Sequence, residues 1–515
     1  MESASYVSGD ILVPGLSHYR RTTHGWKRAG TPGAVGRFCR PLAEPAQEAQ
    51  YSMRIERQAT SVREAQGSLH TLGLAAICFG FFMVILDTSV VNVALPAMQH
   101  DLHGSLAGLQ WVVNGYTLTF ASLLLSAGTF GDRLGHKRAF LMGYCLFTGA
   151  SLLCSLASSL NTLIAARVLQ GVGPALLVPS SLALISHGVQ NPGQRARAVG
   201  IWAGSSGIGL AGGPVIGGML VDMLGWRSIF LLNVPLGLLA LALTMRFVSE
   251  TSRTTTLKRD LWGQVCVIVA LATLTYTLIE GRSQGWISPQ IVGMFVLCIG
   301  ATGGFLLIEM RHSTPMLPLQ LFSAAVFNMP LLVGGILNFG LYGVLFVLSL
   351  FFQDIYHYPA ALAGVALLPI TVATGCTALL SGRITARLGT RRPMIGGLAA
   401  SGLGTILLLL GETGNTIVVL LAGEIMLGLG CGMTVPAMTT AILNTVPRNQ
   451  VGVASALLNA SRQVGGVLGV AILGSILGSL SERNAFLAGM HSALLLVTLL
   501  FLLSSGAVSL IYPAE

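Results

Sequence analysis

Long apolar stretches, separated by short polar segments, follow one another along almost the whole chain after residue 70. Each is long enough for a helix that crosses the hydrocarbon core of a bilayer, which takes about 20 residues. The stretches lack the period-two alternation of a membrane β-barrel, and lipid admits only helices and closed barrels. We therefore expect an all-α polytopic membrane protein with fourteen transmembrane helices. The expected spans are 72–96, 107–130, 139–159, 162–186, 196–220, 228–247, 261–280, 290–310, 326–352, 359–381, 393–411, 417–441, 452–478 and 489–512.

The composition excludes a soluble protein. Of the 515 residues, 53% are hydrophobic and only 9% are charged, whereas a soluble domain carries about 25% charged residues. The 64 glycines favour close approach between helices, which membrane proteins need because the hydrophobic effect does not drive helix association in lipid.

The net charge of +10 reflects membrane topology rather than nucleic-acid binding. With the N-terminus in the cytoplasm, nine of the 29 Lys and Arg residues lie in the first 70 residues and fifteen lie near the inner connections. The outer connections hold only Arg227, Arg282 and Arg483. Cytoplasmic loops of membrane proteins carry this excess of positive charge. We expect both termini in the cytoplasm and no nucleic-acid partner.

Residues 1–70 combine charged residues with scattered Pro and Gly, and they contain no apolar segment typical of a signal peptide. We expect a disordered basic cytoplasmic tail. Met53 opens a shorter lead-in, MRIERQATSVREAQG, which leaves open whether residues 1–52 are translated.

Two segments recur at a nearly constant offset, which indicates an internal duplication. Gly128-Thr-Phe-Gly-Asp-Arg-Leu-Gly-His-Lys-Arg, after the second span, corresponds to Gly382-Arg-Ile-Thr-Ala-Arg-Leu-Gly-Thr-Arg-Arg, after the tenth. Gly171 in the fourth span likewise corresponds to Gly428 in the twelfth. Spans 1–6 therefore match spans 9–14, and spans 7 and 8 are an inserted pair. We expect an N-terminal six-helix bundle, an inserted pair and a C-terminal six-helix bundle over residues 71–250, 251–315 and 316–515.

Four motifs resemble those of the major facilitator superfamily, specifically its branch of 14-span drug:proton antiporters. The patterns are G-x-x-x-D-R-x-G-x-K/R-R at 128–138, R-x-x-Q-G at 167–171, G-x-x-x-G-P-x-x-G-G at 209–218, and a segment at 86–96 that looks like L-D-x-T-V-V-N-V-A-L-P. The residues that carry the resemblance are Gly128, Asp132, Arg133, Gly135, Lys137, Arg138, Arg167, Gln170, Gly171, Gly209, Gly213, Pro214, Gly217, Gly218, Asp87 and Asn92.

The resemblance implies two pseudo-symmetric bundles and secondary transport without a cofactor. It also implies that segment 128–138, as a cytoplasmic gating loop, acts as a latch that favours the outward-open state, and that Arg167 takes part in proton coupling. Ala386 stands where the first copy has Asp132, so the role of the carboxylate is assigned to the first copy only. Positive-inside topology alone would explain the Lys and Arg of this segment but not its Asp and glycines.

Asp87 is the strongest functional candidate on physical grounds. A carboxylate in mid-span costs about 2.5–3.5 kcal/mol on insertion scales, and such residues usually face a cavity or a partner. Burial raises the pKa of a carboxyl group and a nearby arginine lowers it, so an acid that moves between such environments can take up and release a proton. The alternative is a buried acid that only pairs helices. Proton exchange requires this side chain to reach solvent in at least one state.

Arg167 and Glu424 occupy equivalent positions in the two halves. Arg167 has a predicted depth that overlaps with that of Asp87, so we expect contact between them; a purely structural tie is the alternative. Glu424 is the second candidate for proton or cation binding across the cavity, or else a solvated acid near the outer interface.

Segment 209–218 is interpreted as a close helix contact with a flexible point at Pro214 that serves as a hinge; packing alone is the alternative. The overlapping G-x-G-x-x-G at 207–212 lies in a span without a βαβ unit and does not indicate nucleotide binding. We expect no metal site. The candidates for lining a central cavity are Asn92, Trp111, Tyr116, Gln170 and Arg462.

Together these features predict a proton-coupled plasma-membrane exporter that is not an enzyme and functions as a monomer. Its expected partners are small hydrophobic or cationic substrates, protons and the lipid bilayer. A dedicated exporter of one metabolite, lipid or antibiotic on the same scaffold stays open, as does a non-transporting membrane sensor or enzyme.

Overall fold

The structure is a computed structural model, and it describes residues 71–189, 191–251, 260–311, 319–413, 416–447, 450–477 and 482–512. These residues belong to one compact unit, 66–515. The basic tail expected over residues 1–70 lies outside the described residues. None of the described ranges contains a β-strand, so the all-α expectation is confirmed.

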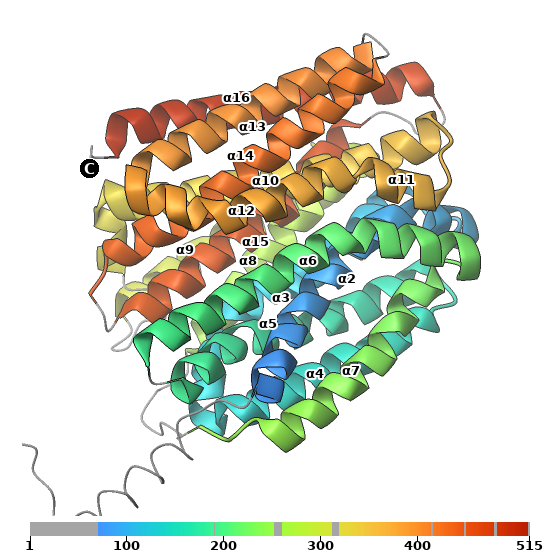
Figure 1. The fold of residues 1–515 in the computed structure, drawn as a ribbon. Helices are drawn as coiled ribbons and strands as arrows, with labels where there is room; N and C mark the ends of the chain where they lie inside the picture. The colour runs from blue at the N-terminus through green and yellow to red at the C-terminus, as the bar shows by residue number, and fades with distance from the viewer. Residues whose placement is uncertain are drawn as a thin grey trace, which may run out of the picture. The chain divides into compact units, whose positions relative to one another are not determined.

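Each of the fourteen expected spans coincides with one helix or with a helix that is interrupted near one end (Figure 1). The first group comprises α2 (Thr71–Leu102), α3 (Leu106–Leu134), α4 (His136–Ser155), α5 (Leu160–Gly188), α6 (Pro192–Leu224) and α7 (Arg227–Phe247). The inserted pair is α8 (Leu261–Gln284) and α9 (Pro289–Arg311). The last group comprises η1 (Leu319–Ser323), α10 (Ala325–Leu350), the π-helical turn η2 (Phe351–Ile355), α11 (Ala360–Ala366), α12 (Leu368–Leu388), α13 (Arg391–Thr413), α14 (Ile417–Asn444), α15 (Val451–Ile476) and α16 (Arg483–Ile511).

Thirteen of these segments are long and apolar enough to cross a membrane, counted over the described residues. The segment that does not meet this criterion is α3, which is 29 residues long and carries Gln110 and Asn114 among its apolar residues. The polar residues of α3 lie inside the protein, since both amides are buried. The count of fourteen spans therefore stays a prediction that depends on α3.

The helix contacts repeat between the two groups and reproduce the duplication seen in the sequence. In the first group α2 packs on α6, α3 and α4 pack on α5, and α4 packs on α7. In the last group α10 packs on α15, α12 and α13 pack on α14, and α13 packs on α16. The contacts between groups are also paired by this symmetry, because α3 packs on α15 and α12 packs on α6.

Two glycines at repeat-related positions show why the motifs recur. A methyl group on Gly171 of α5 would collide with the backbone carbonyl of Tyr116 on α3, and a methyl group on Gly428 of α14 would collide with the carbonyl of Ile370 on α12. Both helix pairs thus approach closely enough to exclude any side chain at the crossing. Small residues allow this contact between helices in lipid.

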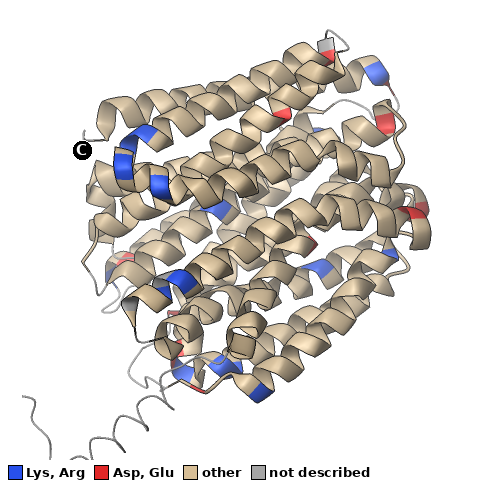
Figure 2. Ribbon diagram, in the orientation of Figure 1, with Lys and Arg blue, Asp and Glu red and all other residues tan. Residues whose placement is uncertain are grey.

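Charged residues separate along the helix axes. Figure 2 shows most Lys and Arg at the left-hand ends of the helices, whereas acidic residues mark several right-hand ends. We call the end with the α3–α4 and α12–α13 connections, at residues 134–136 and 388–391, the basic end. We call the end with the α2–α3 and η2–α11 connections, at residues 102–106 and 355–360, the opposite end.

The inserted helix α8 contacts both groups, whereas α9 packs mainly on α8. Toward the basic end, Gln264 of α8 donates to the Ser122 carbonyl of α3 at 2.7 Å. Toward the opposite end, Ser475 of α15 donates to the Leu278 carbonyl at 2.6 Å, and Arg282 donates to the carbonyls of Ser475 and Leu477. Helix α8 therefore covers the seam where α3 meets α15.

Candidate functional site

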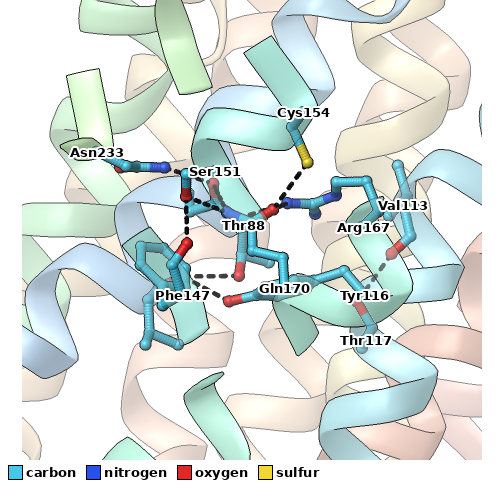
Figure 3. Close-up of polar contacts among 12 residues, drawn as sticks. Thr88, Val113, Tyr116, Thr117, Phe147, Ser151, Cys154, Arg167, Gln170 and Asn233 are labelled. Atoms are coloured by element: carbon cyan, nitrogen blue, oxygen red, sulfur yellow. Dashed lines mark hydrogen bonds and ion pairs between the residues drawn. The ribbon is translucent and has the colours of Figure 1, made fainter. Parts of the chain in front are cut away.

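Asp87 lies at the middle of α2 with its carboxylate fully enclosed by polar side chains. Its Oδ2 forms an ion pair with Nη1 of Arg167 at 2.6 Å. Its Oδ1 accepts hydrogen bonds from Gln170 Nε2 at 3.0 Å and from Asn233 Nδ2 at 2.8 Å. Figure 3 shows Arg167, Gln170 and Asn233 converging from α5 and α7. The contact between Asp87 and Arg167 that the sequence predicts is present.

Arg167 is held on every side as well. Its Nε donates to the Val112 carbonyl at 3.1 Å, and its Nη1 also donates to Gln170 Oε1 at 2.7 Å. The guanidinium carbon lies 4.2 Å from the ring centre of Tyr116, within the range of a cation–π contact. The cation is thus stabilised by an acid, by dipoles and by an aromatic face at once.

Gln170 extends the network to α4, because its Nε2 also donates to Ser151 Oγ at 2.8 Å. Tyr116 belongs to the same site: it is fully buried and donates its hydroxyl to the Val84 carbonyl at 3.4 Å. Five helices, α2, α3, α4, α5 and α7, therefore meet at one polar cluster inside the N-terminal group.

Burial decides what this cluster can do in the conformation described. Asp87 is 0% exposed and Arg167 is 1% exposed. Breaking a buried ion pair leaves an uncompensated charge and costs about 3–5 kcal/mol. A proton can therefore reach Asp87 only after the helices around it rearrange.

Glu424 on α14 is enclosed but, unlike Asp87, has no polar partner. It is 0% exposed, and neither of its carboxylate oxygens has a hydrogen-bond partner among the described residues. It is not the solvated interfacial acid that was one of the two sequence readings. An ionised carboxylate in this position would lie unpaired in an apolar setting, which is strongly unfavourable.

Arg462 on α15 is the other charged group deep within the C-terminal group. Its Nε donates to Asn338 Oδ1 of α10 at 3.4 Å. Among the described residues, no carboxylate forms an ion pair with it.

The remaining cavity candidates lie in two different places. Asn92 is buried beside the α2–α10 contact, where its backbone carbonyl accepts a 2.6 Å hydrogen bond from Ser349. Trp111 faces the inserted helix, because its indole donates to Glu280 Oε1 at 3.2 Å. The structure thus brings Tyr116 and Gln170 to Asp87 but sets Asn92, Trp111 and Arg462 apart from it.

The segment 209–218 lies inside a continuous α6 that runs through Pro214. Three of its glycines face α2. A methyl group would meet Phe82 if added to Gly209, Ser89 if added to Gly213, and Val90 if added to Gly217. Gly218 faces α11 instead, with Ala361 Cα 2.7 Å from the position of an added methyl. The segment packs α6 simultaneously on its own group and on the other group.

The sequence reading of 128–138 as a loop was wrong in its local structure. Gly128, Asp132 and Arg133 lie in the last turns of α3, Lys137 and Arg138 lie in the first turn of α4, and only Gly135 links the two helices. Gly135 ends α3 with a φ of 96°, a backbone conformation that glycine adopts most readily.

This connection docks on its own group. The Arg138 Nε and a carboxylate oxygen of Glu250 lie 3.5 Å apart, and Lys137 Nζ donates to the Met245 carbonyl at 3.0 Å. Asp132 pairs with His136 at 3.1 Å rather than with an arginine.

The two groups are joined at the opposite end. Asp222 of α6 accepts hydrogen bonds from the backbone N–H groups of Ala360 and Ala361 at 3.1 and 2.8 Å. Gln110 of α3 donates to the carbonyls of Val470 and Ala471 on α15 at 2.9 and 2.8 Å. These bonds close the seams α6–α11 and α3–α15 at that end.

Helices α6 and α12 diverge toward the basic end. A methyl group on Gly207 of α6 would lie 3.7 Å from Gly375 Cα of α12, and one on Gly204 would reach only the tip of Leu379, at 3.9 Å. A methyl group on Gly200 would meet no described atom of another helix within 4 Å. The conformation is therefore closed at the opposite end and separated, along this seam, toward the basic end.

Sequence reasoning missed three contributors to this arrangement. Asn233 was overlooked because a single amide in an apolar span carries no motif, although its burial cost is a usable signal. Asp222 was not singled out, since nothing in the neighbouring sequence shows that it caps a helix of the other group. Asn338 could not be recognised from the sequence because its hydrogen-bond partner, Arg462, is 124 positions away.

Comparison with known proteins agrees with this geometry. Residues 77–470 match the profile of the Major Facilitator Superfamily. The chain is 39% identical over 421 residues to the methylenomycin A resistance protein of Bacillus subtilis, covering 81% of this chain and 90% of that protein. It is 37% identical over 408 residues to the multidrug resistance protein Stp of Mycobacterium tuberculosis, covering 79% and 76%. The D-xylose-proton symporter shares its fold, with a TM-score of 0.64 at 13% identity over 87% of this chain and 99% of that one.

Proposed function

This chain belongs to the major facilitator superfamily, and from that premise we propose that it is a proton-coupled antiporter that exports hydrophobic, often cationic drugs across the plasma membrane. The function rests chiefly on one observation, the fully buried ion pair of Asp87 with Arg167. The proposed proton coupling follows from the location of that pair, and the proposed direction of transport follows from the charge distribution and from the closure of the opposite end.

The ion pair links conformation to protonation. In the closed arrangement Asp87 has its charge balanced by Arg167 and two amides. If the helices of the N-terminal bundle rearrange during transport and separate the pair, the Asp87 carboxylate loses its counter-ion and can take up a proton. When the pair closes again, Arg167 displaces that proton. One proton is thereby moved for each conformational cycle in which the pair opens.

The direction of transport follows from the positions of the charges. The basic end has the excess of Lys and Arg typical of cytoplasmic loops, so we assign it and both termini to the cytoplasm. The separation of α6 and α12 then lies on the cytoplasmic side, and we infer that a substrate enters from that side or from the inner leaflet. The α3–α4 connection, docked here on Glu250, is released from that contact to latch the bundles in the outward-open state.

Two further elements serve the same cycle. Segment 209–218 sits at α6 contacts with both groups, so we assign it the role of hinge about which the groups rock. Glu424, buried without a polar partner, is a second acid that a rearrangement of the C-terminal bundle would have to expose. We assign it a supporting role in proton or cation binding.

The chain needs no cofactor in this scheme, since the proton gradient provides about 2.3 kcal/mol per charge per 100 mV in addition to the pH term. All proposed site residues lie in one chain, so we infer a monomeric transporter that is not an enzyme.

Efflux from proteoliposomes tests the proposal. The purified full chain is reconstituted with several dyes, and the pH gradient and the membrane voltage are imposed separately. We expect a pH gradient to drive dye accumulation by the wild type and not by Asp87→Asn, with both variants equally well inserted. Normal pH-driven transport by Asp87→Asn would remove Asp87 from the mechanism.

A dedicated exporter of a single compound is the second candidate, favoured by the similarity to a relative named for resistance to methylenomycin A alone. Substrate breadth separates the two. Expressing cells protected against several unrelated compounds support the multidrug reading, and protection against one compound supports the dedicated exporter.

A further inference from the structure

Four charged side chains lie well inside the helices of the described residues, away from both helix ends: Asp87, Arg167, Glu424 and Arg462. Asp87 and Arg167 neutralise one another at 2.6 Å. Glu424 is completely enclosed, with neither oxygen hydrogen-bonded among the described residues. The only one of the four that is partly exposed is Arg462.

Arg462 lies on a helix that is mostly enclosed by protein. Among the described residues of α15, only Gly452 is exposed, and the others are buried or half-buried. Ala460, close to Arg462 in the same helix, packs against the hydrophobic core of the N-terminal group. Arg462 follows two residues later and lies on the other side of α15, where it contacts Gly334 and Asn338 of α10, roughly 16 Å along α15 from its basic end at 1.5 Å per residue.

The surroundings of Arg462 orient the guanidinium without neutralising it. Its stem passes Gly334 of α10, and its Nε donates to Asn338 Oδ1 at 3.4 Å. The titratable groups near it are Tyr342 of α10 and Cys431 of α14, and neither is a carboxylate that could form an ion pair with it. Only Nε is engaged by a hydrogen bond within the described residues, and the guanidinium carries further donors in a planar fork that matches carboxylates and other oxyanions.

A second unpartnered polar group lies on the facing bundle. Asn114 of α3 is 0% exposed, and neither atom of its amide has a hydrogen-bond partner among the described residues. It follows Gln110 by four residues and so lies on the face of α3 that Gln110 uses to bind α15. A buried amide without a partner is unfavourable, and a substrate oxygen that reaches it after a rearrangement of the bundles would accept a hydrogen bond from its Nδ2.

We propose that Arg462, oriented by Asn338, is a recognition site for an anionic group on the substrate, so that this exporter carries acidic and zwitterionic amphiphiles as well as cations. This inference rests on the proposed export function and deepens it by naming a substrate class. Anions bind where Arg462 provides the uncompensated positive charge, whereas cations rely on the opening of the Asp87–Arg167 pair.

Two dyes with the same ring system and opposite charge test the proposal. Carboxyfluorescein is the anionic probe and rhodamine 123 is the cationic probe. Binding to the detergent-solubilised full chain is measured by fluorescence anisotropy, and efflux is measured in proteoliposomes with an imposed pH gradient. The variants are Arg462→Gln and Arg462→Lys, and the matched control is Arg195→Gln, which removes one exposed positive charge from α6 at the basic end.

We expect Arg462→Gln to weaken carboxyfluorescein binding about tenfold or more, the loss typical of a hydrogen-bonded charge pair. Rhodamine 123 should bind within about twofold of the wild type or more tightly, Arg462→Lys should retain part of the anion affinity, and Arg195→Gln should change neither dye. Equal weakening of both dyes would overturn the proposal, as would a wild type that does not bind carboxyfluorescein.

Two further comparisons distinguish loss of the anion site from misfolding of the variant and from failure of the proposed export function. If Arg462→Gln fails to fold, Asn338→Ala takes its place, and it should weaken carboxyfluorescein about threefold while sparing rhodamine 123, since the guanidinium loses its orientation but keeps its charge. If neither dye moves with the pH gradient, the proposed export function fails, whereas anisotropy in detergent still decides for or against the anion site.

Discussion

Asp222 on α6 caps the N-terminus of α11 by accepting a hydrogen bond from the backbone N–H of Ala360, and this contact joins the two helical groups at the opposite end. The neighbouring N–H of Ala361 binds the second carboxylate oxygen. Because free N–H groups and a partial positive charge concentrate at a helix N-terminus, a carboxylate suits this position. The contact therefore stabilises the conformation that is closed at that end.

Asp222→Ala should open the opposite end. Loss of the cap should weaken the closed conformation by roughly 1 kcal/mol, or about fivefold in population, because net hydrogen bonds are modest and Asp222 is exposed. Distance measurements between spin labels on the α6–α7 and η2–α11 connections would detect the shift. Asp222→Asn, which keeps an acceptor, should give an intermediate shift, and unchanged distances in both variants would contradict the role of the cap.

Variants of the Asp87–Arg167 pair should affect protein stability and proton coupling differently. Asp87→Asn leaves Arg167 buried without its acid, so we expect the variant to lose about 3–5 kcal/mol of stability together with proton coupling. Arg167→Gln added to Asp87→Asn removes the uncompensated charge and should restore much of the melting temperature in detergent while leaving pH-driven efflux absent. If the double variant transports with a pH gradient, the pair is only a structural tie.

The repeated glycine crossings should respond alike to a methyl group. Gly171→Ala and Gly428→Ala each push a methyl into a backbone carbonyl, so we expect each to destabilise the fold by about 1–3 kcal/mol. Thermal unfolding in detergent measures this. Gly149→Ala on α4, where no described atom lies within 4 Å of the added methyl, is the control, and it should be neutral or slightly stabilising because Ala favours helix.

The hydrogen bonds from Arg282 of α8 should protect the end of α15. Arg282→Ala removes the guanidinium that donates to the Ser475 and Leu477 carbonyls, so the end of α15 near residue 476 should exchange its backbone hydrogens faster. Hydrogen exchange with mass spectrometry on peptides that cover 468–477 checks this. Ser283→Ala, whose hydroxyl bonds only to Glu280 of its own helix, should leave that exchange unchanged, and an equal effect in both variants would argue against the anchor.

The sequence determined the helices, the separation of charge along them and the duplication, because each of these is a property of neighbouring residues. Span length and hydropathy specify a membrane helix locally, and the spacing of Gly171 and Gly428 within their repeats marks the crossings. Even the pairing of Asp87 with Arg167 was predictable, since two opposite charges at similar depth in helices of the same bundle stabilise one another.

Only the tertiary structure decided which polar groups have partners. Asn233 reaches Asp87 across 146 positions, Asp222 reaches Ala360 across 138, and Arg462 reaches Asn338 across 124. Whether a buried charge is neutralised, capped or left free depends on side chains that folding brings in from other helices. Electrostatic energy changes with distance and burial rather than with position along the chain, and for this reason the sequence alone could not distinguish the balanced charge of Arg167 from the unbalanced charge of Arg462.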